Sequence, residues 1–526
     1  MSFVAALAVV SITGFLSLSY EILWYREFAF ASGSAPWVFG RVLAAFLIGL
    51  AQGSIVSRRF VTSKRATSRV YQFRVVCAAV IASSIAAYLV VPGLAWLATH
   101  RLWQAGFVLV AGAAFVMGLV LPLVSELGIA PNERVGERLS FLYLANVIGS
   151  AFGSLLTGFV LSNIWSVETI SIALALAGLA IGVILSIVAL RAAVEASGAA
   201  TAIRESSLAL GLTVCGAFLI AAHHPLFYHV YERLFYKEAA PSKAAFAEVV
   251  ESRGGVVAVT QSREVFGGGV YDGMIETDMV RDSNLLVRAY ALGAFHPHPS
   301  RMLMIGLGTG AWATSLLQLP GVEHLTAVEI NEGYLSIIAR HPEVRGVLKD
   351  PRVSIVIDDG RRWLLQHPNE RFDAIVMNTT WYWRAHSTNL LSSEFMQLAR
   401  AHLNPGGVLY YNTTWSPDAM KTGMSAFPYG MRCVNFLALS DSPVAFDSTR
   451  WSEVLNELRD ERGRRLFEDG SRKPRLDSLL ALVPSIHETP RGYGLETRAS
   501  VLSRVADAHI ITDDNMRVEW RATPPD

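Results

Sequence analysis

Three groups of polar residues in the second half of the chain could together bind a nucleoside. The turn Gly306–Gly310 follows an apolar run and opens a helical one, so a ligand could approach its backbone N–H groups closely. Glu329 ends the next apolar run, where a carboxylate can accept hydrogen bonds from both ribose hydroxyls. Asp358 and Asp359 end a third run and could receive an adenine amino group. Together these residues predict a nucleoside-binding site, and the alternative is a purely structural role.

The spacing of the glycines indicates which class of nucleoside-binding enzyme the turn is typical of. Gly306, Gly308 and Gly310 form a G-x-G-x-G turn, whereas dinucleotide-binding enzymes use G-x-G-x-x-G. No second phosphate-binding loop follows in the sequence. The pattern is therefore more typical of a methyltransferase than of a dinucleotide enzyme.

Apolar runs and helical stretches alternate around these groups. Predicted strands are Met302–Ile305, Leu325–Ile330, Val353–Ile357, Ala374–Met377 and Val408–Tyr411. Predicted helices are Trp312–Leu319, Glu332–His341, Arg361–Gln366 and Ser393–Leu403. This alternation predicts an α/β, Rossmann-like domain in which helices cover a parallel sheet and ligands bind at the carboxyl ends of the strands. Before it, the glycine-punctuated runs of Ala244–Asp282 predict a small antiparallel β lead-in.

The first half of the chain is predicted to cross a membrane. Hydrophobic residues make up 52% of the 526 residues and charged residues only 17%, below the roughly 25% usual for soluble proteins. Seven apolar runs approach the ~20 residues that a membrane-spanning helix needs. They are Phe3–Leu23, Trp37–Val56, Val75–Leu97, Trp103–Leu123, Phe141–Leu161, Ile170–Leu190 and Ser207–Ala222. We therefore expect a multi-pass protein of the cell membrane.

The composition changes near His223 and divides the chain into three predicted regions. Residues 1–223 form a helical membrane domain, residues 224–300 a linker with the β-rich lead-in, and residues 301–526 the nucleoside-binding domain. Lysine and arginine are concentrated in alternate loops, a bias that places the N-terminus inside the cell. Seven spans would then put the last domain outside. Either one span is miscounted or this domain is extracytoplasmic.

Other patterns bear on partners and assembly. The net charge of +1 gives no sign of nucleic-acid binding. The three cysteines are far apart and the histidines show no metal-ligand spacing, so no metal site is expected. Gly149, Gly153 and Gly158 have the spacing of small residues that lets membrane helices approach closely, either within one bundle or at a dimer face.

The segment Met302–Tyr411 resembles the core of spermidine synthases, the polyamine aminopropyltransferases. The similarity lies in Tyr271-Asp272-Gly273, Val328-Glu329-Ile330, Ile357-Asp358-Asp359-Gly360 and the turn Asn404–Gly407. Segments similar to membrane-fused members of this family are Tyr20–Trp24, Leu43–Ser54 and Thr512–Asn515. The resemblance implies an enzyme of polyamine biosynthesis that transfers the aminopropyl group of decarboxylated S-adenosylmethionine to putrescine. It also implies a homodimer as one assembly.

The acceptor side departs from the pattern of this family. A diamine is a dication, so its site needs carboxylates, one of which must orient the attacking amine or take its proton. The resemblance places one acid at the position of Thr309 and two more within Asn378–Tyr382, a segment that contains none here. Asn378, at the position of the catalytic aspartate, keeps the shape of that residue but cannot take a proton. Glu276 stands where the resemblance implies a substrate-binding glutamine.

Several residues could replace the missing acids. Trp381 and Tyr382, with Trp383, would line the acceptor side and hold a cation or an apolar acceptor, or else they cover the domain or touch the membrane segment. Candidate replacement acids, each of which could equally be a solvated loop residue, are Glu276, Asp278, Asp282, Asp513 and Asp514. His386 is a candidate base near the same loop.

Three functions therefore stay open, and whether the chain is an enzyme is itself a hypothesis. The leading one is a membrane-anchored transferase that moves an aminopropyl group to a polyamine through an altered acceptor site. The second is methyl transfer from S-adenosylmethionine itself to a hydrophobic acceptor, which Thr309 would permit. The third is a catalytically inactive protein that binds a nucleoside or a polyamine and regulates the membrane domain. The retained Glu329, Asp358 and Asp359 favour an enzyme.

Overall fold

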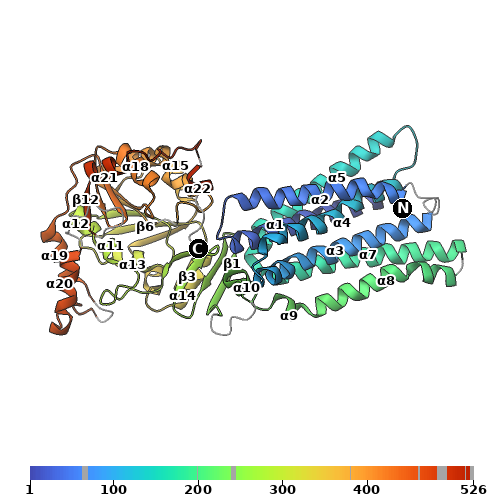
Figure 1. Cartoon of the computed structure of the whole chain (residues 1–526), viewed down its shortest axis with the longest axis horizontal. Helices are drawn as coiled ribbons and strands as arrows, with labels where there is room; N and C mark the ends of the chain where they lie inside the picture. The colour runs from blue at the N-terminus through green and yellow to red at the C-terminus, as the bar shows by residue number, and fades with distance from the viewer. Residues whose placement is uncertain are drawn as a thin grey trace. The chain divides into compact units, whose positions relative to one another are not determined.

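A computed structural model describes residues 1–61, 69–197, 199–238, 245–378, 381–459, 463–482, 494–515 and 517–521. Its contacts divide the chain into two units. The first, helical unit comprises Met1–Ser32, Trp37–Ala245 and Glu251–Arg253. The second, α/β unit comprises Gly33–Pro36, Phe246–Val250 and Gly254–Asp526. A membrane-type helical part followed by an α/β domain confirms the predicted fold class (Figure 1).

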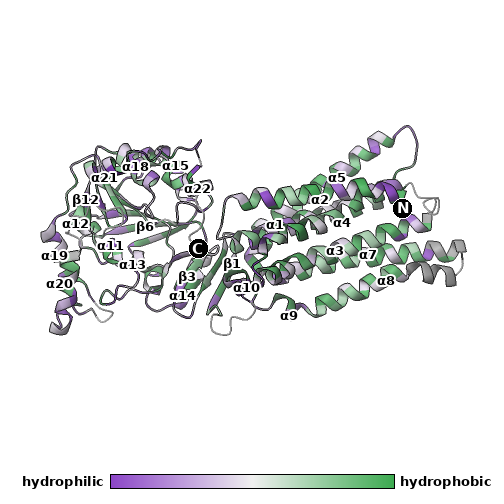
Figure 2. Cartoon of the chain, viewed as in Figure 1, coloured by the Kyte–Doolittle hydropathy of each residue, from purple (hydrophilic) through white to green (hydrophobic). Residues whose placement is uncertain are grey.

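Long apolar helices make up the helical unit, as the green ribbons of Figure 2 show. Six helices in the described residues are long and apolar enough to cross a membrane. The long helices are α1 (Phe3–Ala31), α2 (Trp37–Val61), α3 (Arg69–Thr99), α4 (Gly106–Gly128), α5 (Val135–Leu155) and α7 (Val167–Ser197). Shorter helical segments are Trp103–Ala105 before α4, and Leu156–Leu161 and α6 (Ser162–Ile164) after α5. The first six predicted spans fall within these helices.

The seventh predicted span, Ser207–Ala222, differs from the other six. It forms the second part of α8 (Ala199–Ala221), which is followed by α9 (His223–Phe227) and α10 (Val230–Tyr236). Ser207–Ala221 qualifies as a span only together with His223–Tyr236, from which it is bent by 63°. The described residues therefore contain six such helices, and the bent pair counts as a seventh span only if it crosses as one unit, so the prediction of about seven spans stays a prediction.

Glycines let the helices of this unit approach at backbone distance. A Cβ atom added at Gly149 of α5 would lie 1.9 Å from the Ser11 carbonyl oxygen of α1. The same addition at Gly153 would lie 2.2 Å from the Phe15 carbonyl oxygen, whereas Gly158 has nothing within 4 Å. Two of the three glycines thus serve packing within the bundle, which is how membrane helices associate without a hydrophobic drive.

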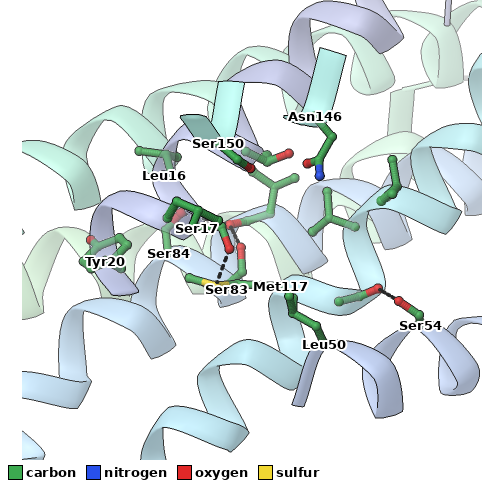
Figure 3. Close-up of a pocket in the computed structure, with 16 residues that line it drawn as sticks. Leu16, Ser17, Tyr20, Leu50, Ser54, Ser83, Ser84, Met117, Asn146 and Ser150 are labelled. Atoms are coloured by element: carbon green, nitrogen blue, oxygen red, sulfur yellow. Dashed lines mark hydrogen bonds between the residues drawn. The ribbon is translucent and has the colours of Figure 1, made fainter. Parts of the chain in front are cut away.

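A cavity of about 160 Å³ lies within the helical unit (Figure 3). Hydroxyl groups line much of it, but they bond to their own surroundings: Ser54 donates to the Gly118 carbonyl and Ser17 to the Met117 sulfur. Ser83 and Ser84 both donate to the Val80 carbonyl. No charged side chain is among the lining residues. The cavity therefore offers nothing that would compensate the charge of a diamine.

The α/β unit contains an eight-stranded mixed sheet in the order β12-β10-β11-β9-β8-β5-β6-β7. Its strands are β5 (Arg301–Ile305), β6 (His324–Glu329), β7 (Val353–Ile357), β8 (Phe372–Met377), β9 (Leu403–Asn412), β10 (Tyr429–Cys433), β11 (Phe436–Ser440) and β12 (Leu495–Thr497). The five predicted strands are β5 to β9, and they are parallel to one another. The expected parallel sheet is confirmed for these five strands, and β10, β11 and β12 extend it as antiparallel strands.

The side chains of the central strands alternate between two apolar clusters, one on each face of the sheet. On β5, Met302 and Met304 enter the first cluster, whereas Leu303 and Ile305 enter the second. Both faces are covered by helices, so the strands read as continuous apolar runs. Helices of the first face are α11 (Val287–Tyr290), α12 (Leu292–Phe295), α13 (Ala311–Leu316), α14 (Gly333–Arg340), α19 (Ser448–Glu457) and α20 (Lys473–Leu482). Helices of the second face are α15 (Gly360–Gln366), α16 (Thr388–Leu391), α17 (Ser393–Ala401), α18 (Pro417–Ala426), α21 (Arg498–Arg504) and α22 (Arg517–Arg521).

The predicted β lead-in is a separate four-stranded sheet in the order β1-β2-β3-β4. Its strands are β1 (Glu248–Ser252), β2 (Gly255–Val259), β3 (Glu264–Gly267) and β4 (Val270–Met274), and β2, β3 and β4 pair antiparallel. One local prediction differs from the structure: Asn404–Gly407, expected as a turn, lies inside β9, where Gly406 has a φ of +82°.

A matched pair of glycine substitutions tests the packing between α1 and α5. We expect Gly149→Ala to lower the stability of the helical unit by about 1–3 kcal/mol, because its methyl group would overlap a backbone carbonyl that cannot rotate away. Gly158→Ala should leave stability unchanged or slightly raised, since the position is open. Thermal unfolding of the full chain in detergent measures both variants. Equal effects of the two substitutions would contradict this packing.

Candidate functional site

The three predicted nucleoside-binding groups lie at neighbouring strand ends. Ile305 at the end of β5 pairs with Val328, so Gly306 follows beside Glu329 at the end of β6. Glu329 in turn pairs with Ile357, the last residue of β7, which is followed by Asp358. The strands are parallel and adjacent, so all three groups meet at one carboxyl edge of the sheet.

The glycine turn adopts a backbone that other residues would strain. Gly306, Gly308 and Gly310 have φ values of +86°, +54° and +78°, in the left-handed region that side chains disfavour. The carboxylate of Glu329 organises this turn: Oε2 accepts hydrogen bonds from Leu307 N at 2.8 Å and Gly308 N at 3.1 Å. The turn and the predicted ribose partner therefore form a single structure.

Both carboxylate oxygens of Glu329 accept hydrogen bonds from the backbone. Its second oxygen, Oε1, accepts a hydrogen bond from Asn331 N at 2.8 Å, and the side chain is buried. Burial raises the pKa of Glu329, whereas the backbone N–H groups of Asn331, Gly308 and Leu307 act in the opposite direction. A carboxylate has about four lone-pair positions, so three backbone bonds leave about one for a ligand.

The aspartate pair keeps free oxygen atoms. Asp359 caps α15, because its Oδ1 accepts a hydrogen bond from Arg362 N at 2.8 Å. Asp358 Oδ1 accepts from Asp359 N and from Arg362 Nε, each at 2.6 Å. Within the described part of the chain, Oδ2 of neither aspartate accepts a hydrogen bond. Each residue could thus receive an amino group without losing its present partners.

The β lead-in packs onto the glycine turn. A Cβ atom at Gly308 would lie 3.9 Å from the Asp272 carbonyl oxygen, and one at Gly273 would lie 3.6 Å from the Thr309 methyl group. The Asp272 carboxylate accepts hydrogen bonds from the Tyr334 hydroxyl and from Arg384 Nη1, the latter at 3.3 and 3.4 Å. This acid is therefore already paired with a cation.

A row of amides continues the same edge on the other side of β5. Met377 pairs with Tyr411, so Asn378 follows β8 beside Asn412 of β9, and Asn412 Nδ2 donates to Asn378 Oδ1 at 3.0 Å. Asn435 Nδ2 donates to Asn412 Oδ1 at 2.8 Å, and Arg288 Nη1 donates to Asn435 Oδ1 at 3.1 Å. The sequence analysis missed Asn412, the partner of Asn378, and the two residues beyond it, Asn435 and Arg288. The strand-end position of Asn412 could have identified that residue, but Asn435 precedes an antiparallel strand and gave no signal.

Comparisons with known proteins bear directly on this edge. The family described as spermine/spermidine synthase domain matches residues 290–420. The polyamine aminopropyltransferase of Agathobacter rectalis is 34% identical over 119 residues, which are 22% of this chain and 41% of that protein. The polyamine aminopropyltransferase of Mycobacterium tuberculosis is 27% identical over 314 residues, 57% of this chain and 58% of that protein. Residues 290–420 form a spermidine synthase-like domain.

The likeness covers only part of each relative. The chain spans 41% and 58% of the lengths of these two aminopropyltransferases. Among solved structures, the spermidine synthase of Thermotoga maritima has a TM-score of 0.32 and 19% identity, and the match covers 45% of this chain and 83% of that one.

The predicted acceptor residues of the spermidine synthase-like domain are spread over different environments. Thr309 is buried, and its hydroxyl accepts a hydrogen bond from Ala311 N at 3.3 Å. Tyr382 packs against the apolar cluster of the second sheet face, and Tyr382 N donates to Thr414 Oγ1 at 3.3 Å. The rings of Trp381 and Trp383 stack with centroids 6.3 Å apart, and Trp383 is buried. These contacts favour a covering role for the aromatic residues. Thr379 and Thr380 lie outside the described residues.

The candidate replacement acids mostly have structural partners in the α/β unit. Glu276 Oε1 accepts from Asp278 N at 3.2 Å, and its Oε2 lies 3.4 Å from Arg281. Asp278 accepts from Val280 N at 2.8 Å and from Arg281 Nε at 3.1 Å. The first acid of the Thr512–Asn515 segment, Asp513, forms a two-pronged pair with Arg361 at 2.7 and 2.6 Å, which lowers its pKa. Of the described candidates, His386 is exposed and presents its backbone N–H to Glu519.

Substitution of Glu329 by glutamine tests the link between the turn and the ligand. Glu329→Gln would place an amide NH₂ against backbone N–H donors, so we expect a loss of about 1–3 kcal/mol in stability and weaker binding of methylthioadenosine. Thermal unfolding and calorimetric titration of the full chain measure the two effects. Glu453→Gln, an exposed position on α19, is the matched control and should change neither. If Glu329→Gln were as stable as the wild type, Glu329 would not stabilise the glycine turn as described.

Asp282 should make stability depend on pH. Burial raises the pKa of this carboxyl to about 6, against the opposing N–H groups of Leu286 and Val287. Between about pH 4 and pH 6 the folded state therefore binds more protons than the unfolded chain. The stability that Asp282 contributes is fully present below the unfolded pKa and is lost as the pH rises through 6. Asp282→Asn should remove this loss of stability with rising pH, which amounts to at most about 3 kcal/mol.

Unfolding of the full chain in detergent at several pH values between 4 and 7 measures the slope. Asp507→Asn, at an exposed position, is the control and should keep the wild-type profile. If Asp282→Asn also kept that profile, the carboxyl would titrate at its ordinary pKa.

Proposed function

We propose that this chain is a membrane-anchored, spermidine synthase-like transferase whose donor is an adenosyl sulfonium compound. The observation that carries the proposal is the strand register, which brings Gly306, Glu329 and Asp358 side by side at one sheet edge. The match of residues 290–420 to the spermine/spermidine synthase domain supports the same reaction class. Decarboxylated S-adenosylmethionine is the leading donor, and S-adenosylmethionine is the other.

The residues present fit such a donor. Glu329 has about one lone-pair position left for a ribose hydroxyl, and the free Oδ2 atoms of Asp358 and Asp359 suit the adenine amino group. Glycine at position 308 leaves the turn open to close approach of a ligand. When bound, the sulfonium would make its carbon substituent transferable. In aminopropyl transfer the acceptor amine forms the new C–N bond, the C–S electron pair stays on sulfur to give methylthioadenosine, and the amine proton leaves to water; methyl transfer would instead leave S-adenosylhomocysteine.

The residues expected to bind the acceptor substrate support aminopropyl transfer to a polyamine less well than the donor site does. Asn378 cannot take a proton from the attacking amine, and Asp272 is already paired with Arg384. These two observations favour methyl transfer to an uncharged or hydrophobic acceptor as the second candidate function. The third candidate, a catalytically inactive protein that binds a nucleoside or polyamine and regulates the membrane domain, predicts binding without turnover.

The helical unit supports anchoring in the cell membrane. Its six long apolar helices suit a multi-pass membrane domain over residues 1–223, followed by the lead-in at 224–300 and the transferase domain at 301–526. An even number of spans returns the chain to its starting side. With the N-terminus inside, as the loop charges predict, the transferase domain would also lie inside, where S-adenosylmethionine is made.

Titration of the full chain in detergent tests the donor site. We expect methylthioadenosine to bind, and Asp358→Ala to weaken it by about tenfold, because a charge-assisted hydrogen bond contributes about 1.5–3 kcal/mol. Asp507→Ala is the control and should bind like the wild type. Release of methylthioadenosine from decarboxylated S-adenosylmethionine and putrescine, followed by chromatography, measures turnover. If neither methylthioadenosine nor either sulfonium compound bound, the transferase proposal would be wrong.

A further inference from the structure

The loop that follows β8, Trp381–Ser387, is held by segments from distant parts of the chain. We name it the β8 loop. Two of its backbone N–H groups, those of Arg384 and Ser387, donate to carbonyls within the loop at 3.0 and 3.1 Å. The N–H groups of Ala385 and His386 donate instead to residues elsewhere in the chain. These outside partners therefore fix where the loop lies.

Glu519 of α22 is the first outside partner. Its Oε2 accepts a hydrogen bond from His386 N at 3.0 Å, and its Oε1 accepts one from Thr388 N, just after the loop, at 2.7 Å. Glu519 is 1% exposed, and a buried carboxylate is costly unless hydrogen bonds compensate it. His386 has a φ of +68°, a conformation that a residue with a side chain keeps only where its surroundings hold it. The carboxylate and the strained backbone therefore stabilise each other.

The connection between α1 and α2 supplies the second outside partner, Ser34. This connection, Gly33–Pro36, belongs to the α/β unit. The Ser34 carbonyl accepts a hydrogen bond from Ala385 N at 2.9 Å, and the Ser34 hydroxyl donates to the Gly268 carbonyl of the lead-in at 2.9 Å. Ser34 thus joins the β8 loop to the β lead-in.

The β8 loop reaches the glycine turn through the same lead-in. Arg384 Nη1 donates to the two oxygens of the Asp272 carboxylate at 3.3 and 3.4 Å. A Cβ atom added at Gly308 would lie 3.9 Å from the carbonyl oxygen of Asp272. A chain of contacts therefore runs from Glu519 through the β8 loop and Asp272 to the edge at which the donor is proposed to bind.

The strand order indicates which part of the donor would lie beside this loop. The proposed adenosine contacts belong to two neighbouring strands: Glu329 ends β6 and Asp358 follows β7. β5 with its glycine turn comes next in the sheet, and β8 lies on the other side of β5. A donor that follows this edge, with its adenosine over β6 and β7, extends its sulfonium substituents across β5 toward β8.

We propose that Glu519 is a positioning residue of the donor site. It fixes the β8 loop, and the loop, through Arg384 and Asp272, forms the wall beside which the aminopropyl chain of the sulfonium donor lies. The inference rests on the proposed transferase function and adds to it a residue remote from the predicted site. S-adenosylmethionine carries the same chain with a carboxylate on it, whereas methylthioadenosine lacks the chain. Glu519 should therefore affect the binding of the sulfonium compounds and leave that of methylthioadenosine unchanged.

Calorimetric titration of the full chain in detergent tests this difference. Glu519→Gln places an amide NH₂ where a carboxylate oxygen now accepts from a backbone N–H, so the β8 loop keeps its position in only a fraction of the molecules. The apparent affinity of a ligand that needs the loop falls by that fraction. We expect the sulfonium compound that binds the wild type more tightly to bind Glu519→Gln about tenfold more weakly, while methylthioadenosine binds as before.

Hydrogen exchange measures the position of the loop directly. The N–H groups of His386 and Thr388 should exchange about tenfold faster in Glu519→Gln, whereas those of Gly306–Gly310 should keep their wild-type rates. Glu453→Gln, at an exposed position of α19, is the matched control and should change neither exchange nor affinity. Should Glu519→Gln fail to fold, Glu519→Asp, which keeps the charge but is one methylene shorter, provides the same comparison.

The outcomes separate this inference from the proposed function. If neither methylthioadenosine nor either sulfonium compound binds the wild type, the proposed function is wrong, and this inference with it. If the wild type binds only methylthioadenosine or only the sulfonium compounds, the inference alone is overturned. A structural role without an effect on the donor would change both affinities equally or change neither, and either result overturns the inference. Wild-type exchange rates at His386 and Thr388 in the variant would also overturn it.

Discussion

A single buried carboxylate, that of Glu329, holds together the strand ends on which the site is built. A carboxylate in a protein interior is costly unless hydrogen bonds compensate it, and here three backbone N–H groups do so. Two of them come from the glycine turn, whose left-handed residues direct N–H groups inward. Turn and carboxylate therefore stabilise each other, and neither would keep its geometry alone. The ligand contact expected of Glu329 uses the capacity left over from this structural role.

The carboxyl edge of the sheet is divided by chemistry as well as by topology. On one side of the glycine turn lie the acceptors Glu329, Asp358 and Asp359. On the other lie the amides of Asn378, Asn412 and Asn435, whose direction is set by Arg288, because its guanidinium carries only donors. A transferase needs two recognition surfaces that meet at the reacting atoms. The proposed adenosine is assigned to the acceptor-rich surface, and the other surface carries amides where a diamine site would need carboxylates.

The helical unit is organised by different forces. Its helices meet at glycines such as Gly149 and Gly153, and its cavity hydroxyls bond to helix carbonyls or to the sulfur of Met117. In lipid, such contacts join helices where hydrophobicity cannot. No charged side chain is among the residues that line this cavity. This organisation agrees with the proposed membrane anchor and the proposed transferase domain.

The sequence alone determined the features that depend on local pattern. Alternating runs gave the five parallel strands, and residues that end parallel strands must share one edge, so Gly306, Glu329 and Asp358 could be grouped without a structure. The antiparallel extension of the sheet by β10 to β12 depends on pairing between segments that are distant in the chain, which residue spacing does not encode. The same holds for Asn378. Its missing carboxylate was visible in the sequence, but the hydrogen-bond direction of its amide was decided by Arg288, which reaches it only through segments distant in the chain.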